Sequence, residues 1–278
     1  MSVIVRCDNL IKIHRQGNLE VVALQGLDFE MQAGEFVAMV GRSGAGKSTL
    51  MTILGGMDSP SAGRAMVAGA DLGSLSPRRM VRHYRRNVGF MWQDFTRNLI
   101  PYLRAHRNVE LPMLLAGVSS KLRRKRVRAL MEATGLSTKV YAHVDRLSGG
   151  EQQRLALCVG LALGPSLLLA DEPTGELDTE TSVAVYELLR TLCHDGGLSV
   201  LVVTHDVALA TGADRVVRLE DGRILTERHR HGLDMLTVDR RGRVQLPREM
   251  LKAAGMTDRV AAEVTEEGIL LRRNRYGP

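Results

Sequence analysis

The stretch Gly41-Arg42-Ser43-Gly44-Ala45-Gly46-Lys47-Ser48 matches G-x-x-x-x-G-K-[ST], the pattern of a loop that binds phosphate groups. The apolar run at 35–40 precedes it and predicts a buried strand, and residues 48–54 can continue as a helix. Strand, glycine loop and helix form the context that the pattern requires. We therefore predict a phosphate-binding loop here, against the alternative of a chance glycine-rich turn.

Each part of the loop has a chemical use. Glycines let successive backbone N–H groups turn toward phosphate oxygens, where a Cβ would be in the way. The helix N-terminus adds partial positive charge. Lys47 can reach the terminal phosphates, and the Ser48 hydroxyl can bind Mg²⁺. The residues expected to contact a bound triphosphate are Gly41, Arg42, Ser43, Gly44, Ala45, Gly46, Lys47, Ser48 and Thr49.

The composition is that of a globular protein with an anionic partner. The chain has 278 residues, 44% hydrophobic and 25% charged, with a net charge of +7. No apolar run reaches the roughly 20 residues that span a bilayer, and no signal peptide is expected. Cys7, Cys158 and Cys193 have no metal or disulfide spacing, which favours a reducing cytosol.

The order of elements predicts an α/β fold. Apolar strands at 167–170 and 200–203 alternate with helices, among them 179–192, which favours a mainly parallel sheet with helices on both faces. Shorter β segments are expected at 3–5 and 21–29, and a helical region at about 107–134, where the basic run 121–128 is read as a solvated face rather than a lipid or nucleic-acid patch.

Polar residues at strand ends complement the loop. Asp171 follows a buried strand and can hold Mg²⁺, since hard cations prefer oxygen ligands. Glu172 can polarise a water for attack on a terminal phosphate. His205 ends another strand and can contact that phosphate, although a lone strand-end histidine is more often structural. Gln93 on its own would be an ordinary polar loop residue.

Taken in order, these motifs resemble the nucleotide-binding domain of ABC transporters. The motifs are GRSGAGKS, Gln93, LSGGEQQR, LLLADEPTGELD and VTHD, and together they cover about residues 3–226. The stretches VGFMWQDF, NVELPMLLAG and ADEPTGELD are similar to the lipoprotein-release, macrolide-export and cell-division subfamily. That subfamily works with permeases that have few membrane helices and large extracytoplasmic domains.

The resemblance implies a domain plan and a shared site. It implies an ABC ATPase domain at 1–226, with a β subdomain and a helical subdomain at about 94–163, and a linker at 227–232. Gln93 would sense Mg²⁺ and nucleotide, and Leu177-Asp178 would link two sites across a homodimer that closes around two ATP molecules. His14 stands where the family often stacks an aromatic ring on adenine. The residues that would cap the γ-phosphate of the opposite subunit are Ser148, Gly149 and Gly150, with Gln152 beside them.

Residues 233–278 carry a second pattern. VDRRGRVQLPREM and a final hairpin resemble the AbrB/MazE-like swapped-hairpin module, whose dimers bind DNA. A segment this short cannot bury enough apolar surface alone, so exchange of hairpins with a second copy is expected. We favour a dimerisation clamp over DNA reading. The candidates for DNA contact are Arg240, Arg241, Arg243 and Arg248.

These motifs are compatible with two different functions. The first is an ATP-hydrolysing subunit, peripheral on the inner face of the cell membrane, that energises a permease on a separate chain. The second is a soluble ABC ATPase that acts on DNA through its tail. The sequence has neither long coiled-coil insertions nor a second cassette, which counts against the classes of DNA-acting and translation-type ABC protein that have them.

Overall fold

The computed structural model describes residues 2–17, 19–175, 177–230, 232, 235–238, 242–256, 260–266 and 268–273. The chain divides into two compact units, residues 1–234 and 235–278. Within the described residues, no helix is long and apolar enough to cross a membrane.

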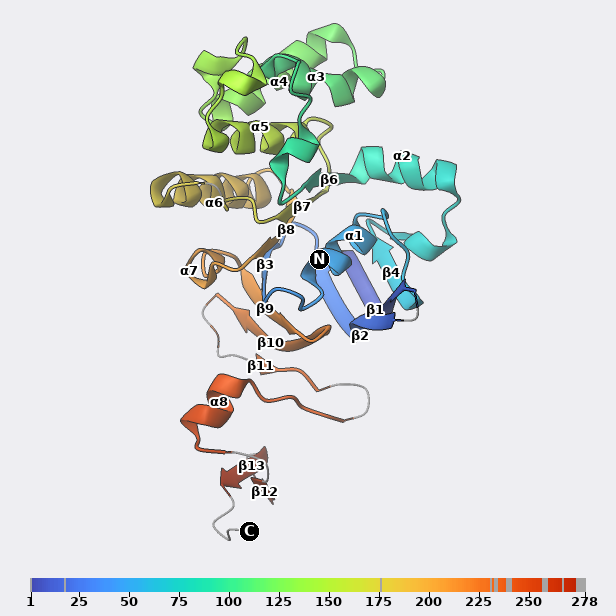
Figure 1. Ribbon diagram of the computed structural model, residues 1–278, viewed down its shortest axis with the longest axis vertical. Helices are drawn as coiled ribbons and strands as arrows, with labels where there is room; N and C mark the ends of the chain where they lie inside the picture. Colours follow the sequence, from blue (N-terminus) through green and yellow to red (C-terminus); the bar gives the residue numbers. More distant parts are fainter. Residues whose placement is uncertain are drawn as a thin grey trace. The chain divides into compact units, whose positions relative to one another are not determined.

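A mainly parallel sheet forms the centre of the first unit (Figure 1). Within this unit the strand order is β10-β9-β3-β8-β7-β6, and only the β9–β10 pair is antiparallel. The predicted α/β fold is confirmed. The strands are β3 (Phe36–Val40), β6 (Val88–Met91), β7 (Leu167–Asp171), β8 (Ser199–Thr204), β9 (Arg215–Glu220) and β10 (Arg223–His229).

Alternation along the central strands divides the apolar residues between two cores. In β3, Val37 and Met39 belong to one core, whereas Phe36, Ala38 and Val40 belong to the other. Successive side chains of a strand point to opposite faces, so a strand covered on both faces must be apolar throughout. All five residues of β3 are buried, which explains why this run could be recognised in the sequence.

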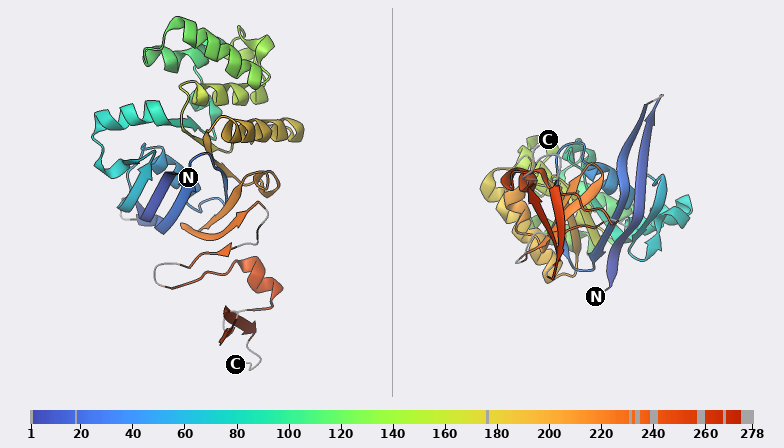
Figure 2. Two further views of the ribbon diagram at one scale, coloured as in Figure 1. Left: turned by 180° about the vertical axis from the view of Figure 1, so that it is seen from behind. Right: turned by 90° about the horizontal axis from the view of Figure 1, so that it is seen from below.

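One core lies between the central sheet and a smaller antiparallel sheet, with helix α1 (Lys47–Leu54) in the same layer. The strand order of the smaller sheet is β2-β1-β4-β5. Its hairpin is much longer than predicted, as Figure 2 shows, because one face is partly exposed and tolerates the polar residues between the apolar ones. These strands are β1 (Val3–Gln16), β2 (Leu19–Gln32), β4 (Ala62–Val67) and β5 (Ala70–Asp71).

Helices cover the other core. The region expected to be helical at 107–134 is divided, because Gly117, at φ 75°, ends the first helix in a left-handed conformation. The elements here are η2 (Phe95–Asn98), α3 (Ala105–Leu115), α4 (Ser120–Ala133), η3 (Ser137–Lys139), η4 (Val144–Arg146), α5 (Gly149–Leu161), α6 (Thr179–His194) and α7 (Val207–Ala210). Between β5 and β6 lie η1 (Leu72–Ser74) and α2 (Pro77–Asn87).

The expected linker begins too early. Residues 227–229 belong to β10, where Glu227 pairs with Val217 and His229 pairs with Arg215. Backbone pairing along β9 extends the strand beyond its apolar residues, and the sequence pattern did not show this. The remaining expected linker residues are described only at Arg230 and Gly232.

The second unit contains a short strand, a helix and, at its end, the predicted hairpin. The elements are β11 (Met235–Leu236), α8 (Arg248–Ala253), β12 (Val260–Thr265) and β13 (Gly268–Arg273). An isolated bridge joins Val238 to Val244. Two of the residues expected to contact DNA, Arg240 and Arg241, lie outside the described residues, whereas Arg243 and Arg248 lie within them.

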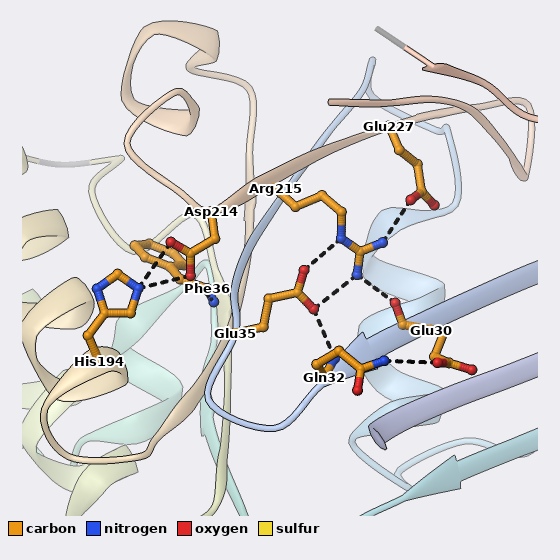
Figure 3. A network of polar contacts seen from close by, with 8 residues as sticks. All are labelled: Glu30, Gln32, Glu35, Phe36, His194, Asp214, Arg215 and Glu227. Atoms are coloured by element: carbon orange, nitrogen blue, oxygen red, sulfur yellow. Dashed lines mark hydrogen bonds and ion pairs between the residues drawn. The ribbon is translucent and has the colours of Figure 1, made fainter. Parts of the chain in front are cut away.

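A buried arginine joins the two sheets of the first unit (Figure 3). Arg215 on β9 donates from Nε to Glu35 Oε1 over 2.7 Å and from Nη1 to Glu227 Oε2 over 2.8 Å. Its Nη2 also donates to the backbone oxygen of Glu30 on β2, over 2.5 Å. Burial lowers the pKa of Arg215, but Glu35 and Glu227 outweigh burial and hold the pKa above its ordinary value.

Replacing this arginine should destabilise the first unit. In Arg215→Ala the partly buried Glu35 carboxylate loses its positively charged partner and keeps the Gln32 N–H, which we expect to cost about 3 kcal/mol. Urea unfolding followed by circular dichroism measures the loss. The control is Arg6→Ala, which removes an ion pair whose side chains are 47% and 43% exposed and should leave the midpoint almost unchanged. Equal shifts in the two variants would contradict this role of Arg215.

Candidate nucleotide site

Close backbone contacts shape the phosphate loop. A Cβ at Gly41 would collide with the backbone oxygen of Leu219, and one at Gly46 would come within 2.5 Å of the backbone oxygen of Ala23. Gly46 also has φ 102° and directly precedes α1. Glycine is required at both positions, because other residues would clash and, at Gly46, would be strained as well. The loop is thus packed closely against the backbone of its neighbouring strands.

Lys47 begins α1 and lies across this loop. Its ammonium donates to the backbone oxygens of Gly41, over 2.8 Å, and Arg42, over 3.0 Å. The amino group is therefore held beside the N-terminus of α1. The ammonium charge and the partial positive charge of the helix end both favour binding of a phosphate there. Contact of Lys47 with the terminal phosphates stays a prediction.

The predicted magnesium ligands meet at the ends of α1 and β7. The Ser48 hydroxyl donates to Asp171 Oδ2 over 3.2 Å, and Asp171 is 6% exposed. Burial raises the pKa of Asp171, and the charge of Glu172 adds to this, whereas the Ser48 bond and Lys47 lower it. A divalent cation would offset this cost of burying a carboxylate, so the pair fits Mg²⁺, which is held through one or two carboxylates.

Glu172 is held in an unusual backbone conformation at the tip of β7. Its φ is 49°, and its N–H donates to the backbone oxygen of Val203 on β8 over 2.8 Å. Its Oε1 lies 2.9 Å from Nδ1 of His205, so these two predicted residues are in direct contact. Gln153 on α5, which we did not predict as a site residue, donates from Nε2 to the Glu172 backbone oxygen over 3.2 Å. Gln153 lies within the LSGGEQQR run, which was the available signal.

A cavity of about 400 Å³ joins these groups. It brings Gln93 together with Asp171, Glu172 and His205 over the phosphate loop. It also includes a part of β2 that the sequence did not indicate. The lining residues are Val21, Val22, Ala23, Gly41, Ser43, Gly44, Gly46, Lys47, Ser48, Thr49, Gln93, Asp171, Glu172 and His205.

His14 lies beside this cavity rather than among its described lining residues. Its Nε2 is 3.4 Å from the Thr49 hydroxyl, and Thr49 does line the cavity. On the neighbouring strand, Val21 pairs with His14 and also lines the cavity. The part of the cavity beyond the phosphate loop is thus bordered by aliphatic side chains of β2.

The segment between β6 and α3 holds Gln93 at the cavity. Asn98 accepts from the Trp92 backbone N–H over 3.0 Å and donates to the Phe90 backbone oxygen over 2.8 Å. Arg97 lies over the Trp92 ring, 3.8 Å from its centre. The two bonds of Asn98 close the loop around Gln93. We did not predict Asn98 because its role depends on contacts at separations of six and eight residues.

The LSGGEQQR run forms a capped helix N-terminus. Ser148 and Glu151 cap each other, with Glu151 N–H to Ser148 Oγ at 3.2 Å and Ser148 N–H to Glu151 Oε2 at 2.9 Å. Gln152 donates to the backbone oxygens of Val144 and Leu147, each over 3.1 Å. Gly149 faces open space. None of Ser148–Gln152 is among the described residues that line the cavity.

Fold and loop together define a P-loop ATPase with a helical subdomain. A model of the ABC transporter family matches residues 24–175. The chain belongs to the ABC transporter family, as its motifs predicted. It is accordingly an ATPase that binds ATP with Mg²⁺.

Several known proteins are similar to this chain. An uncharacterized ABC transporter ATP-binding protein of Thermotoga maritima is 42% identical over 81% of this chain and 94% of its own length. A lipoprotein-releasing system ATP-binding protein LolD of Ruegeria sp. is 44% identical over 82% and 99%. A macrolide export ATP-binding/permease protein MacB of Brucella abortus is 42% identical, but this chain spans only 34% of its length.

Solved structures support the same assignment. A dimeric post-hydrolysis state of the ATP-binding cassette MJ0796, bound to ADP and Pi, is 35% identical with a TM-score of 0.77. It covers 83% of this chain and all of its own. Since the match leaves out about a sixth of this chain, the comparison supports the ATPase fold and not the tail.

Asp171→Asn should raise the stability of the folded chain and abolish ATP hydrolysis. A raised pKa means that the folded chain binds this proton more tightly than the unfolded chain does. Stability is therefore lost as pH rises from about 3.9, the ordinary value, through the folded pKa. Without nucleotide or Mg²⁺, the variant should unfold at a higher temperature than the parent at pH 7, and ATP turnover should vanish.

The comparison is made by differential scanning calorimetry at neutral pH and at a pH below about 3.9, the ordinary pKa of this carboxyl. The difference should shrink at the lower pH. A variant that unfolds at a lower temperature than the parent at pH 7 would contradict the argument.

Proposed function

We propose that this chain is the ATP-hydrolysing subunit of a transporter whose membrane permease is a separate polypeptide. Two copies close face to face around two ATP molecules, and this closure drives the permease. One observation carries the proposal: the cavity gathers the phosphate loop, Gln93 and the acidic pair, while Ser148–Gln152 stay outside its described lining. A second copy would supply the missing wall.

The residue roles follow from the contacts. The phosphate loop and Lys47 bind the triphosphate, and Mg²⁺, held by Ser48, Asp171 and Gln93, supplies charge neutralisation at the phosphates. Glu172 acts as the base that accepts a proton from the attacking water. His205, bonded to Glu172, orients that carboxylate and contacts the γ-phosphate.

Signature residues act on the partner's nucleotide. The exposed N-terminus of α5, with Ser148, Gly149 and Gly150, presents N–H groups and partial positive charge to a γ-phosphate. Gln152 holds the preceding turn through Val144 and Leu147. The dimeric state of the similar cassette MJ0796 supports this pairing, and Leu177-Asp178, next to Gly150 through the Leu177 side chain, connects the two sites.

His14 contributes to the base end of the site. Its imidazole lies by Thr49 and stacks on adenine less strongly than a larger aromatic ring would, so Val21 and Val22 provide much of the apolar contact.

The permease partner follows from the relatives. LolD is named as an ATP-binding protein and MacB as an ATP-binding/permease protein. This chain covers 34% of the length of MacB. In line with the subfamily that its motifs resemble, we assign it a permease with few membrane helices and a large extracytoplasmic domain, and a position on the inner face of the cell membrane. The DNA-acting alternative gains no support from these relatives.

Glu172→Gln tests the assigned base. The amide cannot accept the proton, so steady-state ATP turnover should fall at least a hundredfold, while ATP-bound dimers should accumulate in sedimentation runs. Glu187→Gln, an exposed change on α6, is the matched control and should retain activity. Unimpaired turnover in Glu172→Gln would refute this role.

We further propose that residues 233–278 form an AbrB-like module that holds two copies together between cycles. In the β12–β13 hairpin, Val264 pairs with Ile269 and Ala262 pairs with Leu271, so one face is apolar. Val264 is 84% exposed and Ile269 is 73% exposed. A second hairpin would cover this face, and tethered ATPase domains would rejoin at high effective concentration.

Removing the tail tests this arrangement. A chain ending at Gly232 should dissociate at higher protein concentration than the full chain when no nucleotide is present, as measured by analytical ultracentrifugation. Val264→Ser with Ile269→Ser should reproduce the effect, because both changes lie on the apolar face. Glu263→Gln on the other face is the control. If the dimer is unchanged without the tail, the module has another role.

A further inference from the structure

A second cluster of chemically distinct side chains lies at the other end of β3 from the phosphate loop. Cys193 and His194 end α6, and Asp214 directly precedes β9. Figure 3 shows His194 facing Asp214, whose Oδ2 accepts the Phe36 N–H at the start of β3 over 2.9 Å. One ligand atom each from Cys193, His194 and Asp214 lies within 4.8 Å of the other two.

We propose that Cys193, His194 and Asp214 form a binding site for a divalent transition metal of the Zn²⁺ class, separate from the Mg²⁺ of the ATP site. Thiolate, imidazole and carboxylate are the ligands that Zn²⁺ takes in proteins, and three of them leave a fourth position for water. A site of this composition discriminates against Mg²⁺, which prefers oxygen ligands alone.

The geometry is close to that of a metal site. His194 Nε2 lies 3.0 Å from both Asp214 oxygens, and Cys193 Sγ lies 3.1 Å from the Gly34 backbone oxygen, to which it donates. Ligand atoms around tetrahedral Zn²⁺ are about 3.5 Å apart, given bonds of roughly 2.0–2.3 Å. Small side-chain rotations would therefore bring the three ligands to bonding distance without moving α6 or β9.

The surroundings both orient the ligands and leave a way in. The Phe36 N–H fixes the Asp214 carboxylate, which is the supporting contact that ligating carboxylates require. Cys193 is buried, whereas the His194 and Asp214 side chains are 42% and 30% exposed. An ion can thus enter from solvent past the imidazole and meet the sulfur behind it.

The ligand set can balance the charge of a cation. A carboxylate oxygen of Asp214 lies within 4.8 Å of the Cys193 sulfur, so it would offset positive charge bound between them. On binding, the S–H bond breaks, the proton leaves to solvent, and the sulfur lone pair forms the bond to the metal.

The cluster was not visible in the sequence because its spacing matches no metal-binding pattern. Cys193 and His194 are adjacent, and the third ligand follows only at position 214. In the folded chain the end of α6 lies beside the start of β9, and this brings the three residues together. The inference is independent of ATP hydrolysis, since neither α6 end residue touches the nucleotide cavity.

Co²⁺ is the probe, because its thiolate complexes give a near-ultraviolet charge-transfer band and tetrahedral sites give strong visible bands. Full-length protein without an affinity tag, nucleotide or Mg²⁺ is titrated with Co²⁺, then with Zn²⁺ as competitor. We expect one equivalent of Co²⁺ to produce both bands and Zn²⁺ to abolish them. Absence of the thiolate band would overturn the proposal.

Variants identify the ligands. Cys193→Ser should remove the charge-transfer band, and His194→Ala should weaken Co²⁺ binding at least tenfold. Cys158→Ser, which changes another buried cysteine, should keep the band unaltered. Circular dichroism and Mg-ATP turnover confirm that each variant is folded. A band that persists in Cys193→Ser, or that disappears in Cys158→Ser, would show that the metal binds elsewhere.

Discussion

The close approach of backbone to backbone around the phosphate loop is the constraint on which the first unit depends. Gly41 lies against Leu219 at the end of β9, and Gly46 lies against Ala23 on β2. Ala45 accepts the N–H of Gly222, the turn residue of the β9–β10 hairpin, over 3.0 Å. No side chain larger than hydrogen fits at these contacts, so the loop, the hairpin turn and β2 define one another. The backbone of the phosphate loop is thereby held in place by its neighbours.

The polar residues of the candidate site lie at strand ends, and helix α5 contacts one of them. Asp171 ends β7 and His205 follows β8, its parallel neighbour, so the sheet brings them to one edge. Gln153 on α5 bonds the Glu172 backbone, and the same helix begins with the signature residues. The helix that carries the signature residues is thus bonded directly to the backbone of Glu172. Arg215 on β9 links the antiparallel sheet to the central sheet through its bonds to Glu35 and to the Glu30 backbone oxygen.

Much of the fold and site could be predicted because their signals are local. Buried parallel strands are apolar throughout, and the loop and acidic pair are contiguous motifs. The long β1–β2 hairpin was underestimated because its half-exposed strands mix polar and apolar residues. Val21–Ala23, Asn98 and Gln153 were missed as site residues since each acts through a contact between distant segments. Residues 227–229 joined β10 because pairing with β9, rather than composition, sets where that strand ends.

The linear order of residues was enough to identify the ATPase family, the loop that binds phosphate and the acidic pair that follows β7, since each requires particular residue types side by side. Folding was needed to show that Ser148–Gln152 lie outside the described lining of the cavity, that Arg215 ties two sheets together, and that Cys193 and His194 meet Asp214. The physical reason is that contacts across a sheet or between a helix end and a strand depend on packing. Their sequence separation carries no pattern that would reveal them.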